Sequence, residues 1–185
     1  MNVSQWMSWE GGVDLVAMSD PGLESPNVIV HVARLVHTPL GASPAGLIMI
    51  PNLDDLTGAP LVMGFIAQEV QVGAYFGPQI FADTPFENAY VLQANIEVQI
   101  GSSSGAARIE VGEYVIEMLL SDTSAPYIVD RPIGALPFVQ QGIERSAGAV
   151  SLTINGREVP LTVPQIGISG GPAAVLAPCG LYARP

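Results

Sequence analysis

Lysine is absent from this chain of 185 residues, and all six basic residues are arginine. The protein therefore has no lysine that could form a Schiff base, bind phosphate in a P-loop or act as a general base. The six scattered arginines are outnumbered by 17 acidic residues, and the net charge is −11. Nucleic acids and anionic membrane surfaces are bound through clustered positive charge, so we expect neither as a partner.

Cysteine and charge are also scarce. The single cysteine, Cys179, permits no internal disulfide and no multi-thiolate metal site, and we expect neither a metal nor a cofactor. Charged residues make up 12% of the chain and hydrophobic residues 49%, a balance that excludes intrinsic disorder. Residues 1–10 lack the features of a secretory signal, and the charge-free stretch 159–183 contains four prolines, which exclude a spanning helix. These features predict a soluble, cytoplasmic protein.

Alternation of apolar and polar residues dominates the chain and predicts strands. The pattern is clearest in 90–100, whereas 28–36 is apolar on both faces and should form a central strand covered on both sides. We expect an all-β, mainly antiparallel single domain (1–185), a barrel or sandwich of about eight to ten strands with at most one or two short helices. The expected strands are 13–18, 28–36, 47–50, 61–76 (broken near Gly73), 90–100, 107–120, the two arms of a hairpin within 150–161, and 174–177.

Turn and helix signals punctuate these strands. Asn155-Gly156 between alternating segments predicts a two-residue type I′ hairpin, and 101–105 predicts a flexible hairpin loop. The alternation changes phase at Gly112-Glu113, which predicts a β-bulge. Thr84-Pro85-Phe86-Glu87 fits a capping box and predicts one helical turn, and 137–144 is a weaker helix candidate.

The N-terminal residues 1–12 are predicted to form an arm. Its tryptophans, Trp6 and Trp9, would anchor it onto a neighbouring molecule or pack at the end of the barrel.

Ser169 is the one serine in a nucleophile-like motif. Gly167-Ile168-Ser169-Gly170-Gly171 satisfies G-x-S-x-G, but no Asp, Glu or His follows it, as an α/β-hydrolase would require. Together with Pro172 the motif is similar to the nucleophile motif of the trypsin-like serine proteases. That resemblance implies an all-β fold and a triad of Ser169 with His31 or His37 and with Asp54 or Asp55. It covers six residues and departs from the family at Ile168, where an acidic residue is usual, so we interpret this segment as a glycine-rich loop.

The two histidines are six residues apart, about 20 Å along an extended strand, and do not share a metal at that separation. His31 lies on the two-sided apolar strand and is predicted to be a hydrogen-bonded core or lumen residue. Glu69, Glu113 and Glu117 are the carboxylates that, if two of them pointed into a barrel, would form an acid/base pair. The alternative is that all three lie on solvated faces.

Three stretches without a formal charge, 35–53, 56–68 and 159–183, point to self-association. Interface cores are depleted in charge, and symmetric homo-oligomers are the commonest way to bury such surface. The sequence therefore favours a non-catalytic, self-associating binding or structural module and makes an enzyme less favoured. The alternative is a barrel that binds a small apolar ligand, or an enzyme, with a polar lumen site built from His31 and Glu69, Glu113 or Glu117. A remote alternative is a serine hydrolase at Ser169.

Overall fold

The computed structural model describes residues 5–56, 58–132 and 139–184. Within these ranges the chain forms twelve strands, one α-helix and one π-helix. The helices are α1 (Val70–Tyr75) and η1 (Phe76–Ile80). The strands are β1 (Gln5–Ala17), β2 (Val28–Thr38), β3 (Gly41–Ile50), β4 (Val62–Ala67), β5 (Val91–Gln93), β6 (Asn95–Ile100), β7 (Gly105–Val111), β8 (Tyr114–Thr123), β9 (Tyr127–Pro132), β10 (Val139–Ile154), β11 (Arg157–Glu158) and β12 (Ala174–Arg184).

All the strands belong to one sheet, in the order β5-β4-β3-β2-β1-β12-β10-β8-β7-β6, with β9 and β11 paired to β10. Neighbouring strands are antiparallel except for the parallel pair β4–β5. The two end strands, β5 and β6, are separated only by Ala94, whose backbone N–H donates to the carbonyl of Ala67 at 3.0 Å. The sheet thus nearly closes on itself. The expected all-β, mainly antiparallel domain is confirmed, and of the two expected forms, barrel or sandwich, it is the barrel.

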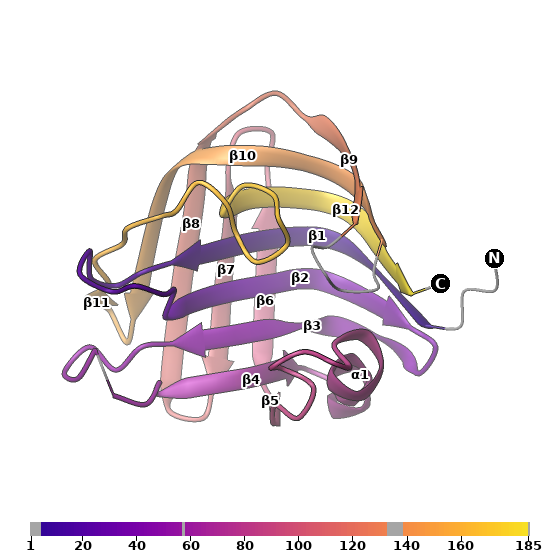
Figure 1. The fold of residues 1–185 in the computed structure, drawn as a ribbon, viewed down its shortest axis with the longest axis horizontal. Helices are drawn as coiled ribbons and strands as arrows, with labels where there is room; N and C mark the ends of the chain where they lie inside the picture. The colour runs from indigo at the N-terminus through magenta and orange to yellow at the C-terminus, as the bar shows by residue number, and fades with distance from the viewer. Residues whose placement is uncertain (1–4, 57, 133–138, 185) are drawn as a thin grey trace.

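The barrel is flattened into two layers. Strands β1 to β4 and β12 form the front layer, and β6 to β8 run across behind them (Figure 1). The long strand β10 joins the layers, because its residues 139–146 pair with β12 and its residues 147–154 pair with β8. Aliphatic side chains fill the space between the layers, among them Val13, Leu15, Val30, Val32, Ile109 and Leu120.

A second core covers the outer face of the front layer. It contains the aromatic side chains Trp9, Phe65, Tyr75, Phe76 and Tyr182 and is capped by α1 and η1. Strand β2 therefore has buried residues on both faces, as its two-sided apolar pattern predicts.

The expected strand 61–76 is wrong in its second half. Strand β4 ends at Ala67, and α1 begins at Val70. Val72, Tyr75 and Phe76 are buried against the sheet with the spacing of one helical face, a signal that the alternation of the preceding residues obscures.

The expected bulge at Gly112-Glu113 is a hairpin turn instead. Val111 pairs with Tyr114, and Gly112 has a φ of 57°. The alternation changes phase there because the chain reverses direction. The Asn155-Gly156 hairpin is confirmed, since Ile154 pairs with Arg157 and both turn residues have positive φ, 49° and 77°.

The two predicted helices and the predicted N-terminal arm also differ from the structure. Thr84–Glu87 forms hydrogen-bonded turns without a helix. Residues 139–144 of the expected helix 137–144 form part of β10, and the remainder lies outside the described residues. Residues 5–12 of the expected arm belong to β1, where the Trp9 indole is buried and donates to the carbonyl of Ala177 at 3.1 Å.

Candidate functional site

A cluster of polar side chains lies on the outer face of the front layer. Asp14 on β1 is paired with His31 on β2, and Gln140 on β10 is paired with Tyr182 on β12. Asp14 reaches this face because β1 is interrupted at Gly11, where φ is 66°. Met7 and Trp9 face outward before that residue, whereas Val13 and Leu15 face the aliphatic core after it.

His31 and Asp14 form an ion pair. The distance between Nδ1 of His31 and Oδ2 of Asp14 is 3.1 Å, and the side chains are 24% and 11% exposed. The N–H is not aimed straight at the oxygen, so the contact is an ion pair more than a linear hydrogen bond. Burial lowers the pKa of His31, but the adjacent carboxylate of Asp14 and the charge of Glu144 outweigh it and raise the pKa above its ordinary 6.5.

Glu144 is the other buried carboxylate of the cluster. Its Oε1 accepts hydrogen bonds from the Arg131 guanidinium and from the Gln140 amide, each at 2.9 Å. The Tyr127 hydroxyl donates to Oε2 at 3.3 Å. A buried carboxylate needs such compensation, and Glu144 obtains it from three side chains.

Arg131 passes close to one of the glycines around Ser169. A Cβ on Gly171 would collide with the guanidinium of Arg131, so a larger residue there would require that side chain to move. The Gly167 N–H donates to the carbonyl of Gly171 at 2.8 Å, and Gly170 has a φ of 76°. The G-x-S-x-G pattern is thus the sequence of a tight turn held over the sheet.

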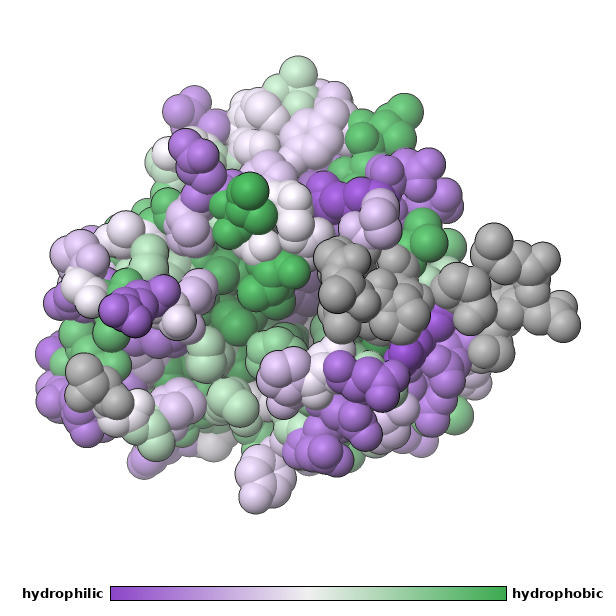
Figure 2. Space-filling view, viewed as in Figure 1, coloured by the Kyte–Doolittle hydropathy of each residue, from purple (hydrophilic) through white to green (hydrophobic). Residues whose placement is uncertain are grey.

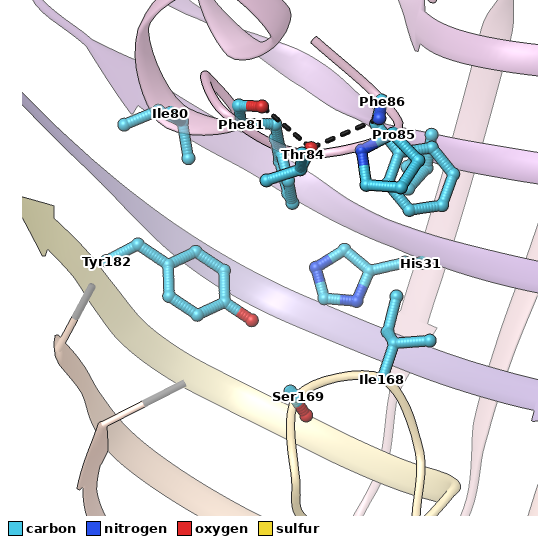
Figure 3. A pocket seen from close by; sticks show the side chains of 10 residues that line it. His31, Ile80, Phe81, Thr84, Pro85, Phe86, Ile168, Ser169 and Tyr182 are labelled. Atoms are coloured by element: carbon cyan, nitrogen blue, oxygen red, sulfur yellow. Dashed lines mark hydrogen bonds between the residues drawn. The ribbon is translucent and has the colours of Figure 1, made fainter. Parts of the chain in front are cut away.

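Ser169 does not face His31 as a triad would require. Its Oγ is 3.5 Å from Nη2 of Arg131, and Figure 3 shows the hydroxyl turned away from the imidazole. The described residues show no hydrogen bond between Ser169 and His31. The other triad candidates lie elsewhere, because His37 is 3.1 Å from Glu10 and Asp54 is paired with Arg157.

A cavity of about 140 Å³ lies between this sheet face and two loops, 81–86 and 166–169. His31, Tyr182, Thr84 and Ser169 contribute its polar lining. Its walls are apolar and are formed by Leu47, Ile80, Phe81, Pro85, Phe86 and Ile168. Figure 2 shows hydrophobic side chains gathered in a hollow at the centre of this face, and Figure 3 shows the side chains that surround it.

The loop 81–86 is shaped by Thr84. The Thr84 hydroxyl donates to the carbonyl of Phe81 at 2.7 Å and accepts from the N–H of Phe86 at 3.1 Å. These bonds place both phenylalanine rings in the wall of the cavity. The capping-box pattern thus marks a local turn, and Glu87 accepts from the N–H of Asp83 at 2.9 Å.

Tyr182 is the most buried polar side chain of the cavity, with 4% of its surface exposed. Its ring packs on Trp9 with centroids 4.8 Å apart. Burial, reinforced by the charges of Asp14 and Glu144, raises the pKa of Tyr182 far above its ordinary value, so its hydroxyl stays protonated. None of the described residues forms a hydrogen bond with this hydroxyl, which points toward the space between His31 and Ser169 (Figure 3).

The carboxylates expected to accompany His31 are not brought to it. Glu69 is exposed at the start of α1, Glu113 is exposed in the β7–β8 turn, and Glu117 lies 3.5 Å from Arg108. The interior of the barrel is aliphatic, and His31 lies on the opposite face of β2. In the described ranges no cluster of three or more His, Cys, Asp or Glu side chains is arranged to hold a metal.

Sequence reasoning missed Asp14, Glu144 and Tyr182. A signal existed for Asp14, because it is the only charged residue in the apolar strand segment 13–18. An isolated carboxylate in a buried strand needs a hydrogen-bond or ion-pair partner.

No protein-family model, curated protein or solved structure matches this chain. Among the described residues, no helix is long and apolar enough to cross a membrane.

Proposed function

We propose that the protein binds a small ligand, mainly apolar and about the size of one ring, in the cavity over β2, β3 and β12. The observation that carries this proposal is the combination of apolar walls with His31 and Tyr182 in the same cavity. Ligand sites are typically apolar concavities with a few well-placed polar groups, and this cavity has that composition.

The volume supports a ligand of this size. A cavity of roughly 150 Å³ lined by Leu, Ile and Phe is known to bind benzene. The present cavity, at about 140 Å³, has similar walls and in addition the polar side chains of Tyr182, which is buried, and of His31, which is partly buried. We favour binding over hydrolysis because Ser169 contacts Arg131 and does not face His31. The imidazole of His31 forms an ion pair with Asp14 instead.

The proposal is tested by nuclear magnetic resonance (NMR) titration of the protein with fluorobenzene, benzyl alcohol and benzoate. We expect at least one of them to bind with a Kd below about 1 mM, which corresponds to about −4 kcal/mol. The variant Ile168→Trp should abolish binding, because residue 168 lines the cavity and a larger ring would fill it.

The matched control is Ile166→Trp, which changes an exposed isoleucine of the same loop that does not line the cavity. It should leave binding unchanged. If none of the three compounds binds, or if Ile168→Trp binds them as well as the parent does, the proposal is wrong.

Self-association is a second proposal, carried by an exposed apolar pair outside the cavity. Ile128 on β9 and Ile143 on β10 are paired across the strands, and Ile128 is 85% exposed. A second copy of the chain would bury this pair through a symmetric contact.

We expect light scattering at micromolar concentration to give a molecular mass that is a multiple of 19.3 kDa. We also expect Ile128→Ser to shift the protein toward the monomer, with Leu119→Ser on β8 as the control. A monomeric parent would contradict self-association.

A further inference from the structure

We propose that the ligand is a carboxylic acid carried on a single ring, and that its carboxylate is bound by the Tyr182 hydroxyl and by Nε2 of His31. This inference rests on the proposed binding function and names the chemical class of the ligand.

The first observation is the unused hydroxyl of Tyr182. A buried tyrosine hydroxyl usually has a hydrogen-bond partner, and this one lacks any among the described residues. It points into the cavity, and its raised pKa keeps it a donor. A ligand that satisfies it must therefore present a hydrogen-bond acceptor.

The second observation is the orientation of His31. Asp14 lies beside Nδ1, which leaves Nε2 as the ring nitrogen that serves the cavity. The side chains of His31 and Tyr182 extend toward each other along the cavity floor (Figure 3), with ring centroids 6.4 Å apart. A protonated imidazole donates from Nε2, so two donors border one space. A carboxylate, with two acceptor oxygens, suits such a pair.

The charges around His31 decide between a charged and a neutral acceptor. Asp14 on β1 and Glu144 on β10 are negative, and Arg131 on β9 is positive. In the loop 81–86 the only charged group is Asp83, and it is paired with Arg184. No charged residue comes from β3 or from 166–171.

The sum of these charges makes binding depend on the state of His31. With His31 protonated, its charge and that of Arg131 balance the two carboxylates, and an incoming anion meets no net negative charge. With His31 neutral, the cluster carries one uncompensated negative charge that repels the anion. Binding of a carboxylate should therefore weaken as the pH rises through the pKa of His31, and binding of a neutral compound should not.

The first test compares benzoate with benzamide, which has the same shape without the charge. At pH 6 we expect benzoate to bind about tenfold or more tighter, as a charge-assisted hydrogen bond implies. Tyr182→Phe should weaken benzoate binding by about tenfold and keep the ring packed on Trp9. Tyr75→Phe is the matched control, because Tyr75 is also buried and does not line the cavity.

The second test follows the two imidazoles by NMR. The chain has only two histidines, so His37→Gln identifies the signal of His31. Saturating benzoate should raise the pKa of His31. It should not move the NMR signal of His37, because His37 is paired with Glu10 outside the cavity. His31→Gln should remove the pH dependence of benzoate binding, whereas His37→Gln should not.

The outcomes separate the two proposals. If fluorobenzene binds and is lost in Ile168→Trp, but benzoate binds no better than benzamide, the cavity binds ligands and the carboxylate proposal is wrong. The carboxylate proposal is also wrong if Tyr182→Phe binds benzoate as tightly as the parent does. It is wrong too if saturating benzoate does not change the pKa of His31. If no ring compound binds, both proposals fail together.

Discussion

The two faces of the front layer are built from the same strands and differ completely in chemistry. On β1, Val13 and Leu15 face an aliphatic core, and Asp14 between them faces the polar cluster. On β2, Val30 and Val32 flank His31 in the same way. The inner face needs only volume and hydrophobicity, whereas the outer face needs particular atoms in particular places. Alternate residues of one strand can thus stabilise the core, while the residues between them form a binding site.

The largest expected effect is on the inner face. Leu15→Ala should lower the free energy of unfolding by about 2–5 kcal/mol, because the deleted methyl groups leave a cavity in a fully buried site. Urea denaturation measures it. The control is Leu119→Ala on β8, where the side chain is partly exposed and the loss should be smaller. An equal decrease in the free energy of unfolding of the two variants would contradict the assignment of the inner face as the stabilising core.

The adjacent residue tests the outer face. Asp14→Asn should lower the free energy of unfolding by about 1–3 kcal/mol, because it leaves His31 without its counter-charge in a mostly buried site. Glu10→Gln is the matched control, since Glu10 is the acidic partner of the other histidine and is exposed. Its effect should stay within about 0.5 kcal/mol. If Glu10→Gln lowered the free energy of unfolding strongly and Asp14→Asn did not, Glu10 and not Asp14 would be the stabilising partner of a histidine.

The pH dependence of stability gives a smaller effect. The pKa of His31 is higher in the folded protein than its unfolded value of 6.5, so the folded state binds the proton more tightly. The resulting stabilisation is fully present below pH 6.5 and is lost as the pH rises through the folded pKa. Urea melts between about pH 6 and 9, where few other groups titrate, should show this decline in the parent. Asp14→Asn should diminish it, and a stability that rises over this range would show that the sign is wrong.

The smallest expected effect is at Ser169. A fluorophosphonate probe should label this residue no more than background, because its hydroxyl faces Arg131 and none of the described residues is placed as a base to activate it. Ser169→Ala should change the free energy of unfolding by no more than about 0.5 kcal/mol, since a contact of 3.5 Å is at most a weak hydrogen bond. Stoichiometric labelling that Ser169→Ala removes would identify a nucleophile on this face.

Local sequence patterns sufficed for features that depend on neighbouring residues. The Asn155-Gly156 hairpin and the two-sided burial of β2 follow from turn chemistry and from alternation. The helix α1 was missed because Val70-Gln71-Val72 alternates as a strand would, although Val70 is exposed in the helix. The Gly112-Glu113 turn was missed because a two-residue hairpin and a bulge shift the alternation in the same way.

The candidate site was much less predictable, because it depends on pairing between distant segments. The β1–β2 register brings His31 to Asp14, and the β10–β12 register brings Tyr182 to Gln140. The interruption at Gly11 then decides which face Asp14 occupies. His31 and Asp14 each stand out in an apolar strand segment, but nothing in the sequence shows that they are paired.

The missing charges have two origins. The stretches 35–53 and 56–68 contain the whole of β3 and β4, which have buried residues on both faces and need no interface to explain their composition. The stretch 159–183 includes the loop over the cavity, where Ile166 and Ile168 are exposed. Self-association remains a prediction that rests on this loop and on the pair Ile128–Ile143.

The position of β12 sets a condition on how the protein can fold. This strand, almost the last segment of the chain, lies between β1 and β10 in the middle of the sheet. Gln5 pairs with Arg184, so the β1–β12 pairing that joins the two halves of the sheet is a contact between segments far apart in the sequence. Such non-local pairing makes folding slow. During synthesis β1 stays unpaired on one side until β12 has left the ribosome. A chain cut short before residue 174 would expose two long sheet edges to aggregation.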